Sequence, residues 1–210
     1  MIILRQKSYS KFGKLISRIV GKKREEGDKI RADIDSLDNI SKSERRKLLG
    51  KLYEGTKKSG VGKTKGLDYE FDPTQGKNGA IITKQGGLKD NPIFIAHEIG
   101  HSENWKTKGG KRRIQASLET PANWEYKEKK LRTGKRPSFG KALKTSFKSA
   151  KQGLTQVREE SKANKKGLEL LKKSGASKKT LDLARKTYKL QNKSYRNQTL
   201  AQILDPLKNY

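Results

Sequence analysis

Residues 90–101, with the sequence DNPIFIAHEIGH, predict a buried helix that presents two histidines side by side. A polar residue followed by proline at the first helical position is a common helix start. Residues 93–99 are apolar almost all round, which is typical of a buried helix. His97 and His101 are the only histidines in the chain and lie four residues apart. Their rings therefore share one face of the helix, close enough to share a metal ion.

Glu98 follows the first histidine, where its carboxylate can act on a water molecule bound to the same ion. This H-E-x-x-H spacing is typical of zinc peptidases. Gly100 lies in the middle of the helix, where alanine would be more stable by roughly 1 kcal/mol, so we expect another element to pack closely against it. The alternative is a pair of histidines on a core helix without metal, which would bury Glu98 without a partner.

A zinc site of this kind needs a third protein ligand and keeps its fourth position open. The chain has no third histidine, so the ligand must be a carboxylate. Glu160 is preferred because it lies on the flank of an apolar helical stripe, whereas Glu159 is expected to point nearly the opposite way. Asn164, one turn later, is placed to accept the outer N–H of a ligating histidine. Glu119 is the main alternative, although Pro121 interrupts the helix it would need, and Glu159 or another acid also stays open.

In residues 160–164, ESKAN, the chain resembles the gluzincin class of zinc metallopeptidases. In that class, H-E-x-x-H is followed on a later helix by a glutamate ligand, often within E-x-x-A-(D/N). The resemblance covers roughly residues 67–195. It implies an α+β, zincin-like fold in which His97, His101 and Glu160 hold one Zn2+ per chain.

The same resemblance assigns Glu98 as the base that takes a proton from the zinc-activated water and passes it to the leaving amine. The oxyanion donor stays open between tyrosine, arginine and the metal alone, with Tyr188 as one candidate. Residues 186–189, KTYK, and the lysine-rich hairpin around them also resemble small metallopeptidase-like proteins encoded among tailed-phage structural genes. This implies a peptidase carried in a phage particle, with a protein or peptide substrate and other virion proteins as partners. The alternatives are a virion structural or cargo protein that retains the fold, and a nucleic-acid-associated regulator that cleaves a repressor.

The composition indicates one modest core and a strong positive field. The chain has 210 residues, of which 30% are hydrophobic, and a formal net charge of +29. We therefore expect one domain with extensions and polyanionic surroundings: nucleic acid, a nucleic-acid-filled particle or an anionic cell envelope. No nucleic-acid-reading motif is present, so such contact would be non-specific, and a merely solvated surface is the alternative. The absence of cysteine excludes disulfides, thiolate ligands and cysteine nucleophiles.

The N-terminal apolar run, within residues 1–5, is too short for a signal peptide. No stretch approaches the roughly 18 apolar residues that a membrane span needs. We therefore expect a soluble protein, cytoplasmic in the producing cell or associated with the virion, without a secretion signal.

Three segments are expected along the chain. Residues 1–66 form a basic, mainly helical N-terminal arm, in which 41–57 is the clearest helix and the first 25 residues order only against a partner. Residues 67–195 form the zincin-like domain, with a Lys/Gly-rich insertion at about 105–150 that is irregular apart from one or two short helices. Residues 196–210 form an irregular tail.

Two strands, at residues 67–71 and 79–84, predict a small antiparallel sheet before the H-E-x-x-H helix. Its exposed edge can hold an extended peptide by main-chain hydrogen bonds, or the strands are an ordinary hairpin packed on the helix. From about residue 153, an apolar stripe that includes Leu154 predicts the first helix of a C-terminal helical hairpin. Residues 60–64, GVGKT, resemble the end of a phosphate-binding loop, but no hydrophobic strand precedes them and position 57 is lysine, so we reject a nucleotide site.

Overall fold

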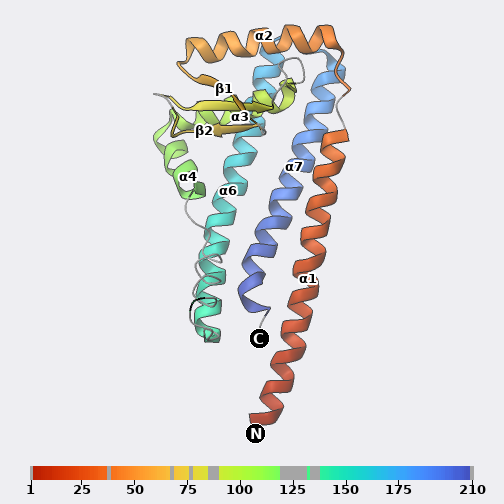
Figure 1. Ribbon diagram of the computed structural model, residues 1–210, viewed down its shortest axis with the longest axis vertical. Coiled ribbons are helices and arrows are strands. Elements are labelled where there is room, and N and C mark those ends of the chain that lie inside the picture. Colours follow the sequence, from red (N-terminus) through yellow and green to blue (C-terminus); the bar gives the residue numbers. More distant parts are fainter. Residues whose placement is uncertain are drawn as a thin grey trace. The chain divides into compact units, whose positions relative to one another are not determined.

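The computed structural model describes residues 2–36, 39–66, 69–75, 78–84, 90–118, 132 and 138–208. Its helices and strands (Figure 1) are α1 (Ile2–Ser36), α2 (Lys42–Lys58), β1 (Gly62–Gly66), β2 (Glu70–Asp72), β3 (Ala80–Lys84), α3 (Pro92–Trp105), α4 (Lys108–Leu118), α6 (Phe139–Lys173), α7 (Lys178–Leu204) and the 3-10 helix η2 (Asp205–Leu207). The described chain is therefore mostly helical with one small sheet. Within these residues, no helix combines the length and the apolar character that crossing a membrane requires.

The chain forms two compact units that interleave along the sequence. Unit 1 comprises Met1–Asp33, Gln115–Val157 and Gln191–Tyr210, and unit 2 comprises Ile34–Ile114 and Arg158–Leu190. The long helices α6 and α7 are each divided between the two units. Unit 2 contains the sheet, α2 and α3, so α2 and β1, which the sequence analysis assigned to an N-terminal arm, belong with the H-E-x-x-H helix.

The sheet of unit 2 has three strands in the order β1-β3-β2. β2 pairs with β3 in the antiparallel direction, as expected, but β1 pairs with β3 in the parallel direction. The sheet is therefore mixed, and the prediction of a purely antiparallel sheet is wrong. β1 has the sequence GKTKG and overlaps the rejected phosphate-loop segment at residues 62–64. Hydrophobic patterning gives no sign of it because its side chains are polar or absent, so only the backbone pairing with β3 defines it.

The helix predicted over residues 41–57 is confirmed as α2. Ser41 caps it, because the Ser41 hydroxyl accepts a hydrogen bond from the backbone N–H of Glu44 at 3.3 Å. The apolar stripe of α2 joins a core cluster with residues of the sheet, α3, α6 and α7. Its buried leucines are Leu48, Leu49 and Leu52.

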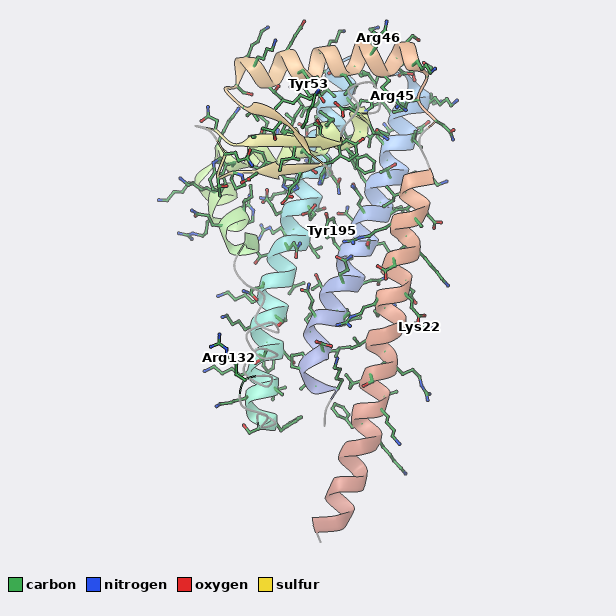
Figure 2. The ribbon with its side chains drawn as sticks, in the orientation of Figure 1. Lys22, Arg45, Arg46, Tyr53, Arg132 and Tyr195 are labelled. Carbon is green, nitrogen blue, oxygen red and sulfur yellow. The ribbon has the colours of Figure 1, made fainter. Side chains whose placement is uncertain are left out.

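A polar cluster around buried Asp90 joins α2, β1 and the start of α3. Tyr53, labelled in Figure 2, extends from α2 and donates a hydrogen bond to Asp90 Oδ2 at 2.7 Å. The Lys63 ammonium group donates to the same oxygen at 2.9 Å and lies over the Tyr53 ring, 3.7 Å from its centre. Asp90 is completely buried and immediately precedes the cap of α3. The cluster therefore fixes the start of the helix that carries both histidines.

The close packing predicted at Gly100 is confirmed. A Cβ atom at this position would lie 2.4 Å from the carbonyl oxygen of Ala163 on α6. A Cβ atom at Gly167 would likewise lie 3.0 Å from the backbone nitrogen of His97. Two glycines therefore let α3 and α6 approach backbone to backbone, which places the two helices at the distance that a shared metal site requires.

α6 begins at Phe139, so residues 139–150 are helical and the prediction of an irregular insertion is wrong for this part. Leu154 is 65% exposed, so its predicted place in the buried stripe is also wrong. The buried face of this part of α6 consists of small residues, namely Ala142, Ser146, Ser149 and Gly153. Small residues carry little hydrophobic signal, which explains why apolar patterning chose the wrong face.

The predicted helical hairpin is confirmed. α6 ends at Lys173, and Gly175 follows with φ of 78°, a left-handed conformation that glycine adopts without steric cost. The Ser177 hydroxyl then accepts a hydrogen bond from the backbone N–H of Thr180 at 3.2 Å and caps α7.

Within the described residues, the first and last segments of the chain are helical and belong to unit 1. α1 starts at residue 2, and its Ile16 and Val20 pack against Ala201 of α7, so the segment expected to need a partner packs on its own chain. α7 continues into η2, so the predicted irregular tail is wrong for residues 196–207. Buried Asp205 accepts a hydrogen bond from Arg24 of α1 at 3.2 Å, a long-range contact that a local pattern does not reveal.

Candidate metal centre

The sequence at the start of α3 positions the two histidines. Asn91 caps the helix, because its side-chain oxygen accepts a hydrogen bond from the N–H of Ile93 at 2.9 Å, and Pro92 follows at the first turn. The apolar residues of the helix are buried on the sides that face the core. This burial leaves His97 and His101 together on the face toward α6, with their rings 4.6 Å apart.

Three potential ligand atoms converge between α3 and α6, contributed by His97, His101 and Glu160. The two histidine Nε2 atoms are 3.1 Å apart. Glu160 Oε2 lies 3.2 Å from the first and 3.5 Å from the second. Around zinc, two donors at corners of a tetrahedron lie about 3.3–3.4 Å apart when each is about 2.0–2.1 Å from the ion. The three side chains therefore fit a metal ion, and this buried group can hold one.

The polarity of the group also fits a cation. Glu160 Oε2 is buried and accepts no hydrogen bond from the described residues. Burial raises the pKa of Glu160, but the neighbouring His101 and His97 rings outweigh it and hold the pKa well below its usual range. Burial lowers the pKa of His101, but the carboxylates of Glu159, Glu160 and Glu98 outweigh it and raise the pKa to about 10. The carboxylates therefore favour a positive charge between them, and a bound divalent ion would supply one.

Glu98 lies beside the ligands and is held by the sheet. Its Oε2 accepts a hydrogen bond from the backbone N–H of Phe71 on β2 at 2.8 Å, while Oε1 is 3.7 Å from His97 Nε2. The pKa of Glu98 is raised, mainly by burial. Phe71 is paired with Ile81 of β3. The backbone N–H of Phe71 bonds to Glu98, so this N–H points away from β3. The free edge of β2 therefore orients the carboxylate and leaves Oε1 facing the ligand group.

Glu159, which the sequence left open as an alternative ligand, lies beside the group in another role. The helical wheel directed it away from the metal, but Glu159 is 2% exposed and its Oε1 lies 3.9 Å from His101 Nδ1. It accepts hydrogen bonds from Asn104 and from Arg113 of α4, both at 2.8 Å. The helical-wheel prediction rested on one buried face of α6, whereas α3 and α4 cover two faces of this helix. A buried carboxylate beside the outer nitrogen of a ligand is the arrangement that fixes the orientation of a histidine ring.

The remaining candidates have different positions. Asn164 is buried one turn after Glu160, but His97 Nδ1 has no hydrogen-bond partner among the described residues and His101 Nδ1 faces Glu159. The hydrogen bond predicted from a histidine N–H to Asn164 therefore stays a prediction. Tyr188 is buried and donates its hydrogen bond to the carbonyl oxygen of Ile93 at 2.8 Å, so its O–H is engaged in joining α7 to α3. Glu119, the alternative ligand, lies outside the described residues.

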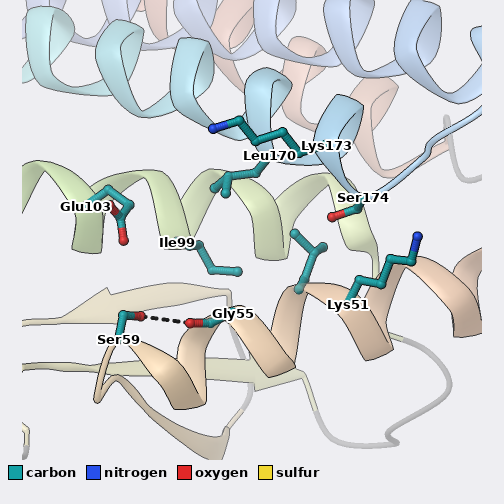
Figure 3. A pocket seen from close by; sticks show the side chains of 9 residues that line it. Lys51, Gly55, Ser59, Ile99, Glu103, Leu170, Lys173 and Ser174 are labelled. Carbon is teal, nitrogen blue, oxygen red and sulfur yellow. Dashed lines mark hydrogen bonds between the residues drawn. The ribbon is translucent and has the colours of Figure 1, made fainter.

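A separate cavity of about 260 Å3 lies on another face of α3 (Figure 3). Ile99 and Glu103 of α3 line it, together with residues of α2 and the end of α6. These two positions are two residues away from His97 and His101, about 200° round the helix. The cavity is therefore not part of the ligand group.

Comparisons with protein-family models, with curated proteins and with solved structures found no match. The chain's own residues therefore have to indicate the class of the protein. Those residues define a buried potential metal centre with two histidines, one carboxylate ligand and a second carboxylate beside them.

Proposed function

We propose that the protein is a zinc-dependent metallopeptidase of the gluzincin type that hydrolyses peptide bonds. The observation that carries the proposal is the convergence of His97, His101 and Glu160 within 3.1–3.5 Å, with Glu98 on the same helix beside them. His97, His101 and Glu160 would hold the ion. When bound, zinc supplies an acidified water and polarises a peptide carbonyl.

Glu98 would act as general base through Oε1. Its Oε2 is fixed by the N–H of Phe71, so Oε1 is the oxygen left to accept a proton from water and deliver it to the leaving amine. A pKa raised by burial suits this role, because it brings the carboxylate closer to the working pH as a proton acceptor. Glu159 would hold the His101 ring in orientation through Nδ1.

The alternative is a structural or cargo protein of a virion that keeps the metal site for stability. The observation that favours it is the low exposure of the ligand side chains, 3% for His97 and 12% for both His101 and Glu160. A structural zinc site is closed, whereas a catalytic site keeps an open position. In the structural case, Glu98 would not be needed as a base.

A cleavage assay on zinc-loaded protein separates these two functions. The substrate is a library of quenched fluorescent peptides, and the variants are Glu98→Gln and Glu103→Gln, which both remove one carboxylate from α3. The peptidase proposal predicts that Glu98→Gln lowers the cleavage rate at least about 100-fold while zinc content is kept, and that Glu103→Gln has no effect. Zinc-loaded wild type that cleaves no peptide, or Glu98→Gln that cleaves like wild type, would contradict it.

A further inference from the structure

Unit 1 carries the exposed large hydrophobic side chains of the described chain. Each exposed large hydrophobic residue, at 38–69% exposure, falls in unit 1, and none falls in the described part of unit 2. Four of them, Phe139, Leu143, Phe147 and Leu154, lie on α6. Phe147 and Leu154 are the most exposed, at 69% and 65%. Unit 2 thus covers its apolar residues, whereas unit 1 leaves an apolar face in contact with solvent.

The first half of α6 is divided lengthwise into three sectors. With about 100° per residue, the four exposed apolar residues fall within one arc of about 80°. A second arc of similar width, next to it on the solvent side, contains Lys141, Lys144, Lys148 and Lys151. The small buried residues of the helix lie on the opposite flank of the apolar arc. Residues 139–157 contain no aspartate or glutamate, so no acidic side chain of this segment offsets its lysines.

α1 of the same unit carries a similar mixture. Lys14, Arg18 and Lys22 are exposed and follow one another at four-residue intervals, which places them on one stripe of the helix. Leu15 is 54% exposed beside that stripe. Exposed apolar and basic side chains therefore occur together on two helices of unit 1, and not on α6 alone.

We propose that the apolar and basic face of α6 in residues 139–157 binds the surface of an anionic phospholipid bilayer. Phenylalanine and leucine side chains enter the boundary between headgroups and acyl chains, while lysine ammonium groups at the end of long stems reach the lipid phosphates. A helix with lysines on one face and Phe and Leu on the next has the composition of an interfacial helix. This inference does not rest on the proposed peptidase activity, because it concerns residues of the other unit.

Charge and composition favour a bilayer over two other occupants. A second copy of the chain carries the same net charge of +29 and would bring its own lysines against those of α6, so self-association is opposed by like-charge repulsion. A nucleic acid would use the lysines, and single-stranded bases stack on aromatic rings, but Leu143 and Leu154 would gain no partner. A bilayer accommodates the leucines, the phenylalanines and the lysines together.

Vesicle flotation tests the proposal on the full-length protein. The vesicles are phosphatidylcholine alone and phosphatidylcholine with added phosphatidylglycerol. The apolar variant is Phe147→Ser/Leu154→Ser, and the basic variant is Lys144→Gln/Lys151→Gln. The matched control is Lys165→Gln/Lys172→Gln, which removes two exposed lysines from the part of α6 that belongs to unit 2. All the substituted residues are exposed. Thermal unfolding curves check that each variant is folded.

The proposal predicts that wild type floats with the anionic vesicles and not with phosphatidylcholine alone. The apolar and basic variants should each lose about tenfold or more in partitioning, and the control should stay within about twofold of wild type. Absence of flotation, an unchanged apolar variant, or equal losses in both lysine pairs would overturn the proposal. A loss of double-stranded DNA binding in the basic variant, with vesicle binding unchanged, would assign the face to nucleic acid instead. Self-association of wild type that the apolar variant abolishes would assign it to a second copy.

Discussion

Substitution of Gly100 by alanine tests the helix contact on which the metal centre depends. The added methyl group would lie 2.4 Å from the carbonyl oxygen of Ala163, whereas ordinary contact begins at 3.4 Å. That oxygen belongs to the backbone of α6 and cannot rotate away. The two helices must therefore separate by about 1 Å at the crossing, or the backbone must distort.

Gly50 on α2 supplies the control that isolates this effect. A Cβ atom at Gly50 meets nothing within 4 Å, so Gly50→Ala gains only the helix propensity of alanine, about 1 kcal/mol. Gly100→Ala gains the same propensity but also incurs the cost of overpacking, about 1–3 kcal/mol. Because the propensity gain is common to both variants, the difference between their free energies of unfolding equals the overpacking cost, about 2 kcal/mol.

Urea denaturation of the metal-free proteins measures this difference directly. Gly50→Ala should be more stable than wild type, and Gly100→Ala should be less stable than Gly50→Ala by about 2 kcal/mol. A competition titration with a zinc chelator should also show about tenfold weaker zinc binding in Gly100→Ala, since Glu160 moves away from the histidines with α6. Equal stability of the two alanine variants would contradict the close approach of α3 and α6 at Gly100.

Further predictions concern the contacts around the centre. Glu159→Gln should weaken zinc binding about 10- to 100-fold in a chelator titration while leaving one ion per chain at saturation, because the orienting carboxylate is lost and the ligands stay; unchanged affinity would remove Glu159 from the site. Asp90→Ala should lower the free energy of unfolding by about 2 kcal/mol in urea, because it leaves the Tyr53 hydroxyl and the Lys63 ammonium group without their shared acceptor; a loss no larger than that of a surface substitution would contradict this. Burial raises the pKa of Glu44, but its hydrogen bonds with Ser177 outweigh this and hold the pKa below its ordinary value of 4.5. The stability that Glu44 adds is therefore complete above about pH 4.5 and is lost as the pH falls through its folded pKa, so wild type and Glu44→Gln should differ at neutral pH and converge in acid; a constant difference in the free energy of unfolding at all pH values would argue against this.

The parts of the structure that local sequence determines were predictable. The caps and apolar residues of α3, the spacing of its histidines and the stripe of α2 each lie within a few turns of one helix. Gly100 was also informative, since glycine inside a buried helix signals close approach. Glu160 was found because it occupies the flank of an apolar stripe on α6.

The parts that were missed depend on contacts between distant segments. β1 has no apolar side chains, so only its pairing with β3 makes it a strand. Glu159 is buried because α4 covers a second face of α6, which no periodicity in α6 reveals. The exposed position of Leu154 follows from a buried face made of small residues in unit 1. In each case the deciding partner is far away in the sequence.

The most direct test of the metal centre is the zinc content per chain by elemental analysis after loading and exhaustive dialysis. Wild type should retain about one zinc per chain. Glu160→Ala should retain much less, whereas Glu169→Ala, which removes an exposed carboxylate of the same helix, should match wild type. Wild type that retains no zinc when it is supplied in excess, or Glu160→Ala that retains as much as wild type, would contradict the assignment of His97, His101 and Glu160 as a zinc site.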